Sequence, residues 1–110
     1  MSQAPRDDGA LARFPFRDRA TAEAGAEPLL DEGTIAGANL LPAMHSLYCW
    51  SGERGKAQQV GVPFKTATSL LEPAVARIIA VHPYKLPAVL GWHCGSVASA
   101  TQAWMGGLVR

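Results

Sequence analysis

Two apolar runs on either side of one polar connection constrain this chain more than any other feature of its sequence. The first run, NLLPAMHSLYCW, begins at Asn39, and the second, VGVPFKT, ends at Thr66. Between them lies SGERGKAQQ, which carries two glycines near its start. Apolar runs around a polar, glycine-bearing connection are typical of a β-hairpin. The sequence therefore predicts a hairpin in the middle of the chain.

The first strand of this hairpin carries apolar side chains on both faces. Strand alternation places one group of residues on one face (Leu40, Met44, Tyr48 and Trp50) and a second group on the other (Leu41, Ala43 and Leu47). The second strand has one apolar face, formed by Val60, Val62 and Phe64. A strand that needs burial on both faces predicts a partner beyond its own sheet.

A strand and a helix are predicted before the hairpin. Residues Leu11 to Phe16 favour a short edge strand, because Pro15 cannot donate a hydrogen bond to a neighbouring strand. Asp18 can then cap a helix that runs from Arg19 to about Glu32. Glycine and proline inside that range predict a bent or weakened helix.

A second helix, a strand and a terminal helix are predicted after the hairpin. In SLLEPAVARIIAVH, Ser69 and Glu72 have capping-box spacing. The helical stripe consists of Leu71, Val75, Ile78 and Ile79. Residues 86–94 predict a further strand. The short C-terminal helix has an apolar side made of Val97, Ala100, Trp104 and Leu108.

This order of elements predicts an α+β fold, a ferredoxin-like βαββαβ sandwich with a C-terminal helix. Both main helices cover one face of the sheet, and the other face lacks a cover within the chain, which predicts a second subunit there. A chain of 110 residues suits a single domain. We expect residues 1–10 to form a flexible tail and residues 11–110 to form that domain.

Composition narrows the partners and the compartment. The chain has 48% hydrophobic residues, 17% charged residues and a formal net charge of +1. It therefore lacks the strong positive charge that would attract nucleic acids or anionic membranes. Cys49 and Cys94 lack the spacing of a disulfide scaffold or a zinc site, which predicts free thiols in a reducing compartment. No secretory signal is visible, so we expect a cytoplasmic protein.

At ANLLPAMHSLYCWSG, FKT and HPYKLP, the chain resembles the CutA divalent-cation-tolerance family, from about Arg13 to Leu108. The resemblance implies a ferredoxin-like fold assembled as a tight homotrimer, with long hairpins joining the sheets of neighbours. It also implies a role in divalent metal ion tolerance or response, including weak binding of copper or another divalent cation. The family has no firmly established catalytic reaction, which implies a protein that is not an enzyme.

The chain departs from the ligand set that the resemblance implies. Copper-binding members carry a cysteine where this chain has Gly37, and some carry a carboxylate where it has Ala88. The residue after the motif tyrosine is often acidic or an amide, and here it is Lys85. Of that proposed set only His82 is present, so any copper site there is expected to be weak.

His82 and Cys49 are the two candidate metal ligands. His82 precedes Pro83 and either binds a metal through a ring nitrogen or donates to the last carbonyls of the preceding helix. Cys49 is the best soft ligand in the sequence, although a buried free thiol is common in an apolar strand. His45 and His93 lack acidic or cysteine partners at a useful spacing.

A further group of residues is expected to line a ligand or subunit cleft: Trp50, Lys65, Tyr84, Lys85 and Trp104. The two lysines either bind an anion or lie as solvated charges at a strand edge. The aromatic rings either line the cleft or pack at a subunit boundary.

Other functions find less support in the sequence. The chain has no glycine-rich phosphate loop, nucleophile elbow or paired carboxylates, so an enzyme is not expected. RNA binding on this fold needs exposed aromatic side chains together with a basic surface, and that combination is not evident. The alternative that stays open is a small-ligand signalling trimer similar to the PII proteins, which have a similar fold.

Overall fold

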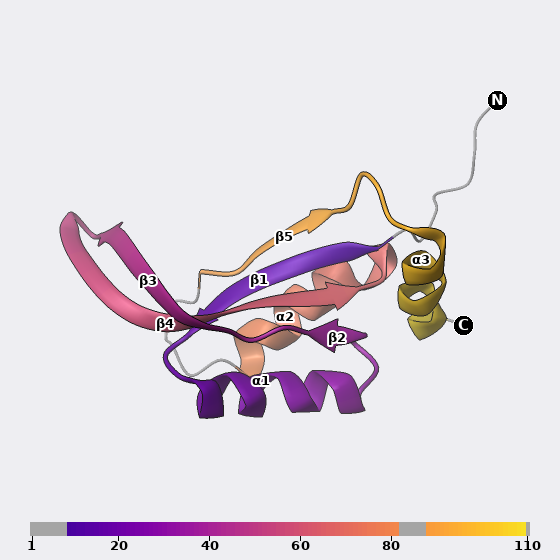
Figure 1. The fold of residues 1–110 in the computed structure, drawn as a ribbon, viewed down its shortest axis with the longest axis horizontal. Coiled ribbons are helices and arrows are strands. Elements are labelled where there is room, and N and C mark those ends of the chain that lie inside the picture. Colours follow the sequence, from indigo (N-terminus) through magenta and orange to yellow (C-terminus); the bar gives the residue numbers. More distant parts are fainter. Residues whose placement is uncertain (1–8, 82–87, 110) are drawn as a thin grey trace.

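The computed structural model describes residues 9–81 and 88–109 (Figure 1). Its elements are β1 (Ala10–Phe16), α1 (Arg19–Asp31), β2 (Gly37–Ala38), β3 (Leu41–Trp50), β4 (Glu53–Thr66), a 3₁₀ turn (Thr68–Leu70), α2 (Leu71–Val81), β5 (Leu90–His93), α3 (Ser99–Gly106) and a final 3₁₀ turn (Gly107–Val109). The candidate residues His82, Tyr84 and Lys85 lie outside the described residues, as do positions 1–8 of the predicted tail.

One five-stranded antiparallel sheet forms the centre of the molecule. The strand order is β2-β4-β1-β5, and β3 pairs with the same strand β4. β4 therefore pairs with β1 along one edge and with β2 and then β3 along the other. α1 and α2 lie on the same side of the sheet, and α3 lies at one end of it (Figure 1). This arrangement confirms the predicted ferredoxin-like fold with a C-terminal helix. β1 pairs with β4 on one side and with β5 on the other, so the edge position predicted for Leu11 to Phe16 is wrong.

α1 begins as the sequence predicts. Asp18 Oδ1 accepts hydrogen bonds from the Thr21 side-chain hydroxyl (2.6 Å) and the Thr21 backbone N–H (2.8 Å). These two bonds hold the pKa of the Asp18 carboxyl below its ordinary value, because they stabilise the ionised form. The helix continues through Pro28 and ends at Asp31. The cap thus satisfies an N–H that has no partner within the first turn.

Gly25 is explained by the packing of α1 on the sheet. A Cβ atom built on Gly25 would lie 2.8 Å from Cε1 and 2.9 Å from Cζ of Phe16. Both residues are buried, so the Phe16 ring occupies the space that any side chain at position 25 would need. A residue that weakens an isolated helix therefore permits close contact between the helix and the sheet.

α2 begins later than the predicted capping box. The chain first makes the 3₁₀ turn at Thr68–Leu70, and α2 begins at Leu71. The Thr68 hydroxyl bonds both polar backbone groups of Gly9, accepting from its N–H (3.0 Å) and donating to its carbonyl (3.2 Å). Leu71 and Ile78 are buried as predicted, whereas Ile79 is 47% exposed. The apolar stripe is therefore narrower than the sequence suggests.

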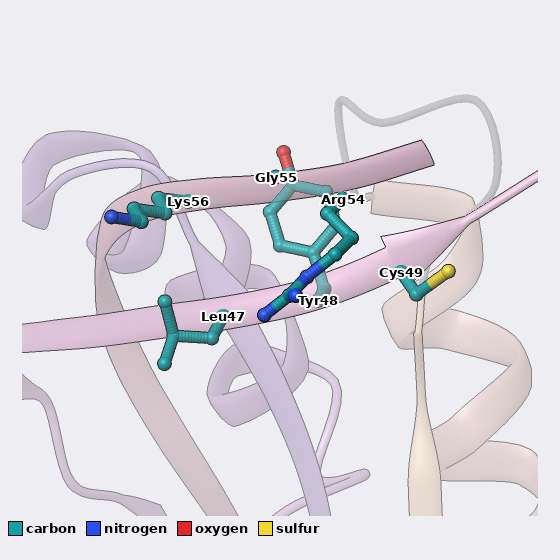
Figure 2. Close-up of a pocket in the computed structure, with 6 residues that line it drawn as sticks. All are labelled: Leu47, Tyr48, Cys49, Arg54, Gly55 and Lys56. Carbon is teal, nitrogen blue, oxygen red and sulfur yellow. The ribbon is translucent and has the colours of Figure 1, made fainter. Parts of the chain in front are cut away.

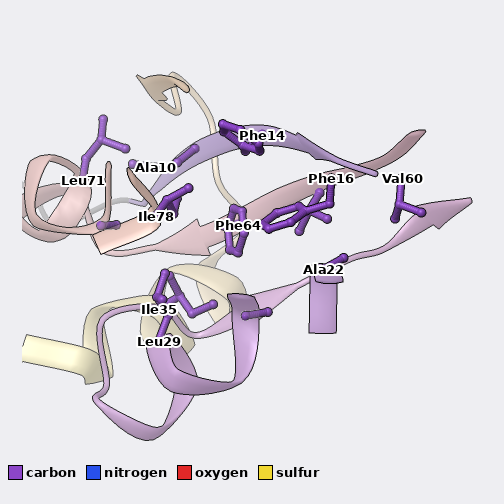
Figure 3. Close-up of a cluster of buried hydrophobic side chains, with 14 residues drawn as sticks. Ala10, Phe14, Phe16, Ala22, Leu29, Ile35, Val60, Phe64, Leu71 and Ile78 are labelled. Atoms are coloured by element: carbon purple, nitrogen blue, oxygen red, sulfur yellow. The ribbon is translucent and has the colours of Figure 1, made fainter. Parts of the chain in front are cut away.

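The core lies between the sheet and the two helices (Figure 3). β1 alternates strictly, so Ala12, Phe14 and Phe16 point into this core. The Phe16 ring is 5.2 Å from the Phe14 ring and 6.3 Å from the Phe64 ring, centroid to centroid, in tilted arrangements. Such aromatic contacts add to the stabilisation from burial. The remaining core residues include Val62, Leu29, Ile35, Ala74 and Ile78.

An ion pair joins the two helices outside the core. Arg77 of α2 donates two hydrogen bonds to Glu32 at the end of α1, through Nε to Oε2 at 2.9 Å and through Nη2 to Oε1. The Arg77 guanidinium lowers the pKa of the Glu32 carboxyl, chiefly through these hydrogen bonds, and the pKa of Arg77 is raised in turn. Because both side chains are open to solvent, the pair makes only a small contribution to stability.

The other side of the sheet, here called the open face, is not covered by α1 or α2 (Figure 1). Residues directly opposite each other on paired strands share a face. The alternation of β1 and its pairing with β4 and β5 therefore assign the open face. Its members include Leu11, Arg13, Pro15, Leu41, Met44, Tyr48, Trp50, Glu53, Pro63, Lys65, Leu90 and Trp92. Leu90 is 67% exposed and Trp50 56% exposed, so the open face is partly apolar, as predicted.

The hairpin differs from the prediction in two ways. Residues 53–59, predicted as a polar connection, belong to β4, and only Ser51 and Gly52 form the turn. Both turn residues have positive φ (53° and 80°), as tight two-residue hairpin turns require. In β3, a bulge between Leu41 and Met44 places both on the open face, so the predicted opposition of these two residues is wrong.

β5 is shorter than the strand predicted at residues 86–94. Only Leu90–His93 form the strand, because the pairing with β1 extends only over Ala10–Arg13. Residues 88 and 89 and Cys94 are described and lie outside it. The Cys94 N–H donates to the Gly9 carbonyl at 3.0 Å, just beyond the end of this pairing.

Candidate functional site

The candidate residues that the structure describes lie in two places. Cys49 and Trp50 lie at the tip of the β3–β4 hairpin, while Lys65 and Trp104 lie near β2 at the far end of β4. Trp50 pairs with Glu53, and Lys65 is twelve residues further along β4. At about 3.3 Å per residue this separation is roughly 40 Å. A single chain therefore cannot bring all four residues into one site.

The hairpin tip carries an open hollow of about 810 Å³, lined by Leu47, Tyr48, Cys49, Arg54, Gly55 and Lys56 (Figure 2). Cys49 pairs with Arg54, and Leu47 pairs with Lys56, so these four side chains share one face of the hairpin. The Cys49 side chain is exposed, so the interpretation as a buried strand thiol is wrong. The hairpin extends past the helices, and nothing within the described chain covers this part of β3.

Tyr48 lies on the opposite face of the same hairpin. It pairs with Gly55, and a Cβ built on Gly55 would lie only 2.5 Å from Tyr48 Cζ. The phenol ring therefore covers the bare backbone of Gly55, as Figure 2 shows. The sequence predicts an apolar strand face for Tyr48 but does not predict this contact. A strand glycine opposite an aromatic residue is the signal that identifies it, once the register is known.

The residues around the tip do not fit a metal centre. The cross-strand neighbour of Cys49 is the Arg54 guanidinium, and Lys56 adds a second cation to the same face. Positive charges oppose cation binding, and a soft metal needs several convergent donors. Within residues 9–81 and 88–109, no three histidine, cysteine or acidic side chains come together in a way that could hold a metal ion.

Among the residues that the structure describes, no cluster of metal donors lies at the second place, near β2. Gly37 pairs with Lys65, and a Cβ on Gly37 would lie 3.0 Å from Cη2 of Trp104. The indole of α3 therefore lies directly over position 37, where the resemblance implies a cysteine. A larger side chain at position 37 would require Trp104 to move, and Ala88, the other expected donor position, has no polar side-chain atom.

Lys65 and Trp104 are the two candidate residues that the fold does bring together. Because directly paired residues share a face, the Lys65 side chain starts beside Gly37 on the open face, next to the Trp104 ring. Lys65 is partly buried and Trp104 is 49% exposed. The pair offers an ammonium group and an aromatic surface, which suit an anionic or aromatic contact better than a metal ion.

Arg13 is a further candidate residue, which the sequence patterns do not identify. A second hollow, of about 390 Å³, lies on the open face and includes Arg13, Met44 and Leu90 in its lining. Arg13 Nη2 lies 3.5 Å from Met44 Sδ, a weak acceptor. An arginine among the alternating residues of the first strand is the signal that was available. That no carboxylate among the described residues pairs with Arg13 became visible only in the structure.

Comparison with known proteins now identifies the family of the fold. The family model described as "CutA1 divalent ion tolerance protein" matches residues 11–107. The chain is similar to the divalent-cation tolerance protein CutA of Thermus thermophilus, with 32% identity over 65 residues, 59% of this chain and 63% of that protein. It is 28% identical to the protein of the same name from Pectobacterium atrosepticum over the full length of both chains.

A solved structure shows the same architecture. The crystal structure of CutA from Xylella fastidiosa matches with a TM-score of 0.86 and 25% identity, covering 94% of this chain and 99% of that one. Since so much of both chains superposes, the similarity extends beyond the sheet to the surrounding helices.

No helix among the described residues is long and apolar enough to cross a membrane.

Proposed function

Because the chain belongs to the CutA1 divalent ion tolerance protein family, which is not a known enzyme family, we propose that it is a non-catalytic protein of divalent-cation tolerance that acts as a homotrimer. The observation that carries this proposal is the family match over residues 11–107, which spans nearly the whole described fold. Nothing in the comparisons favours the alternative of a PII-like signalling trimer. The cytoplasmic location stays a prediction.

Three features of the fold support self-association. The open face exposes large apolar side chains, among them Leu41, Leu90 and Trp92. Residues 53–59 of β4 pair with β3 on one side only in the described chain, which leaves a strand edge unpaired. The candidate cleft residues are also divided between the two ends of β4. A neighbouring subunit that lays its hairpin on this sheet would bring the two groups together.

The proposed cleft between subunits contains Trp50, Lys65, Tyr84, Lys85 and Trp104. His82 is its candidate metal ligand, and Cys49, the second candidate ligand, lies on the other face of the hairpin from Trp50. Because Gly37 and Ala88 supply no donors and Arg54 lies across from Cys49, we propose that cation binding is weak and involves few protein ligands. Tolerance then depends on binding that is transient, without a permanent metal centre.

Calorimetric titration with Cu²⁺ tests the weak site directly. The parent protein is compared with His82→Ala and Cys49→Ser, and we expect weak heats that do not reach a sharp stoichiometric end point. Tight, stoichiometric binding that is lost in His82→Ala would contradict the proposal and establish a defined copper site at that residue.

Cellular tolerance and assembly provide the second test. In a bacterial strain that lacks its own family member, expression of the chain should restore growth at raised copper concentration. Light scattering of the purified protein should give the mass of three chains. A stable monomer at micromolar concentration would rule out the trimer, and growth no better than that of the empty strain would rule out the tolerance role.

A further inference from the structure

The charges of the open face are separated along the length of the molecule. Within the described residues, the part of the open face over the helices carries two cations, Arg13 and Lys65, and no carboxylate. Among all described residues of the open face, the only carboxylate is that of Glu53, at the tip of the hairpin. The two ends of the same surface are therefore complementary in charge.

Arg13 lies at the centre of the helix-covered part of the sheet. It pairs with Pro63 of β4 on one side and with Leu90 of β5 on the other, so both direct neighbours are apolar. Its one described hydrogen-bond acceptor is the thioether of Met44. If a second subunit covered this surface without supplying an anion, a guanidinium would be buried without a proper partner, which is strongly unfavourable.

Glu53 cannot supply that anion within its own chain. It is ten residues from Pro63 along β4, which corresponds to roughly 33 Å of strand. Its open-face neighbours are aromatic, because it pairs with Trp50 and Tyr48 follows on the same side. The hairpin tip therefore presents an apolar surface with one carboxylate at its end. The sheet of another copy presents an apolar surface with one central guanidinium.

We propose that Glu53 forms an ion pair with Arg13 of a neighbouring copy of this chain, and that this pair fixes where the hairpin lies on the neighbour's open face. The inference rests on the homotrimer proposed above and adds the contact that sets its geometry. The tip of one copy binds the sheet centre of the next, so the interface is heterologous, and such contacts can close into a ring. An arginine accepts a carboxylate in a bidentate geometry, which gives such a contact orientation as well as energy.

Arg13 is a better partner for Glu53 than Lys65 is. Lys65 lies at the end of the sheet beside Gly37, where the Trp104 ring already covers part of the open face. Arg13 is exposed, while Lys65 is partly buried. The hollow beside Arg13 also leaves space for an incoming side chain next to Met44 and Leu90.

Subunit exchange between isotopically labelled and unlabelled protein, followed by native mass spectrometry, tests the ion pair. We expect Glu53→Arg and Arg13→Glu each to speed exchange about tenfold or more, because each places like charges together in the interface. The double variant Arg13→Glu/Glu53→Arg should return to within about threefold of the parent rate, because the pair is restored with its charges reversed.

Two further variants serve as controls. Arg54→Glu reverses a charge beside Glu53 but on the other face of the hairpin, and it should change the exchange rate by less than about threefold. Lys65→Glu combined with Glu53→Arg should remain fast. Both Arg13 and Glu53 are exposed in the single chain, so circular dichroism should show that each variant folds.

The outcomes separate this inference from the trimer itself. A trimeric parent whose exchange is unchanged in Glu53→Arg, or a double variant no slower than the single ones, would overturn the ion pair and leave the trimer intact. Rescue by Lys65→Glu would show that Arg13 is the wrong partner. A monomeric parent would remove the trimer and the ion pair together.

Discussion

The two faces of the sheet use the same strands for different purposes. On β1, Phe14 and Phe16 point toward the helices and are fully buried, while Arg13 and Pro15, alternating with them, point the other way. The covered face has its hydrophobic partners within the chain. On the open face, Trp50 and Leu90 are exposed and lack such partners among the described residues. The covered face therefore stabilises the folded chain, and the open face is the surface through which we propose that copies of the chain assemble.

The largest effect should come from the covered face. Phe64→Ala removes a fully buried ring that packs near Phe16, and we expect it to lower the free energy of unfolding by about 3–5 kcal/mol. Guanidinium denaturation at a fixed chain concentration measures this loss. Ile79→Ala, on the exposed side of α2, is the control and should cost about 0.5 kcal/mol. Equal losses would mean that the core is not where the structure puts it.

The open face should respond through assembly. Trp50→Ala should weaken subunit association by about 2 kcal/mol, because large aromatic residues often dominate interfaces. Trp104→Ala should weaken it less, since that ring lies on Gly37 of its own chain. Sedimentation over a range of concentrations gives both dissociation constants. If the two substitutions have the same effect, the hairpin tip is not the part that reaches the neighbour.

A smaller effect on the covered face should come from Gly25→Ala, which tests the contact between α1 and the sheet. Alanine is the better helix former, by about 1 kcal/mol, so Gly25→Ala would stabilise a helix free of contacts. Here the added Cβ would collide with the Phe16 ring, and overpacking of this kind costs about 1–3 kcal/mol. We expect a net loss of about 1 kcal/mol in thermal or denaturant unfolding. Ala24→Gly, on the exposed side of the same helix, is the control and should lose stability through helix propensity alone. If Gly25→Ala instead stabilised the protein, the contact between Gly25 and Phe16 would be contradicted.

The smallest effect should come from the ion pair between Glu32 and Arg77, which lies on neither face of the sheet. The pKa of Glu32 is lowered in the folded chain, so its stabilising contribution is present above the ordinary glutamate value near 4.5 and is lost as the pH falls through the folded value. Glu32→Gln should therefore lower the melting temperature slightly at pH 7 and not at pH 2. Glu27→Gln makes the same change at an exposed position of α1. A difference from the parent that persists unchanged at pH 2 would exclude the ion pair as its cause.

Most of the candidate site was beyond prediction from the sequence. Trp50, Lys65, Cys49 and Trp104 were selected by residue type and by resemblance, and neither indicates how far apart two residues lie on one long strand. Lys65 and Trp104 are neighbours because β2 pairs with β4 and α3 returns to that edge, a contact between segments far apart in the chain. From the sequence alone, Arg13 is indistinguishable from any charged residue on the outer face of a strand. Only the pairing shows that its neighbours on β4 and β5 are apolar.

The sequence by itself determined the order of the main helices and strands, the fold class and the family, whereas the short strand β2 was not predicted. Three patterns each span only a short stretch of sequence: the period-two alternation in β1, the Asp18 cap of α1 and the apolar stripe of α2. Local sequence is therefore enough to predict them. Only the tertiary structure decided the extent of β4, the bulge that places Leu41 and Met44 on one face, and the contact of Gly25 with Phe16. These features depend on register and on contacts between distant segments, and a shift of one residue reverses which face a strand side chain occupies. Local periodicity is compatible with more than one such register, and the packing of the whole chain selects the one that buries Phe14, Phe16 and Phe64 together.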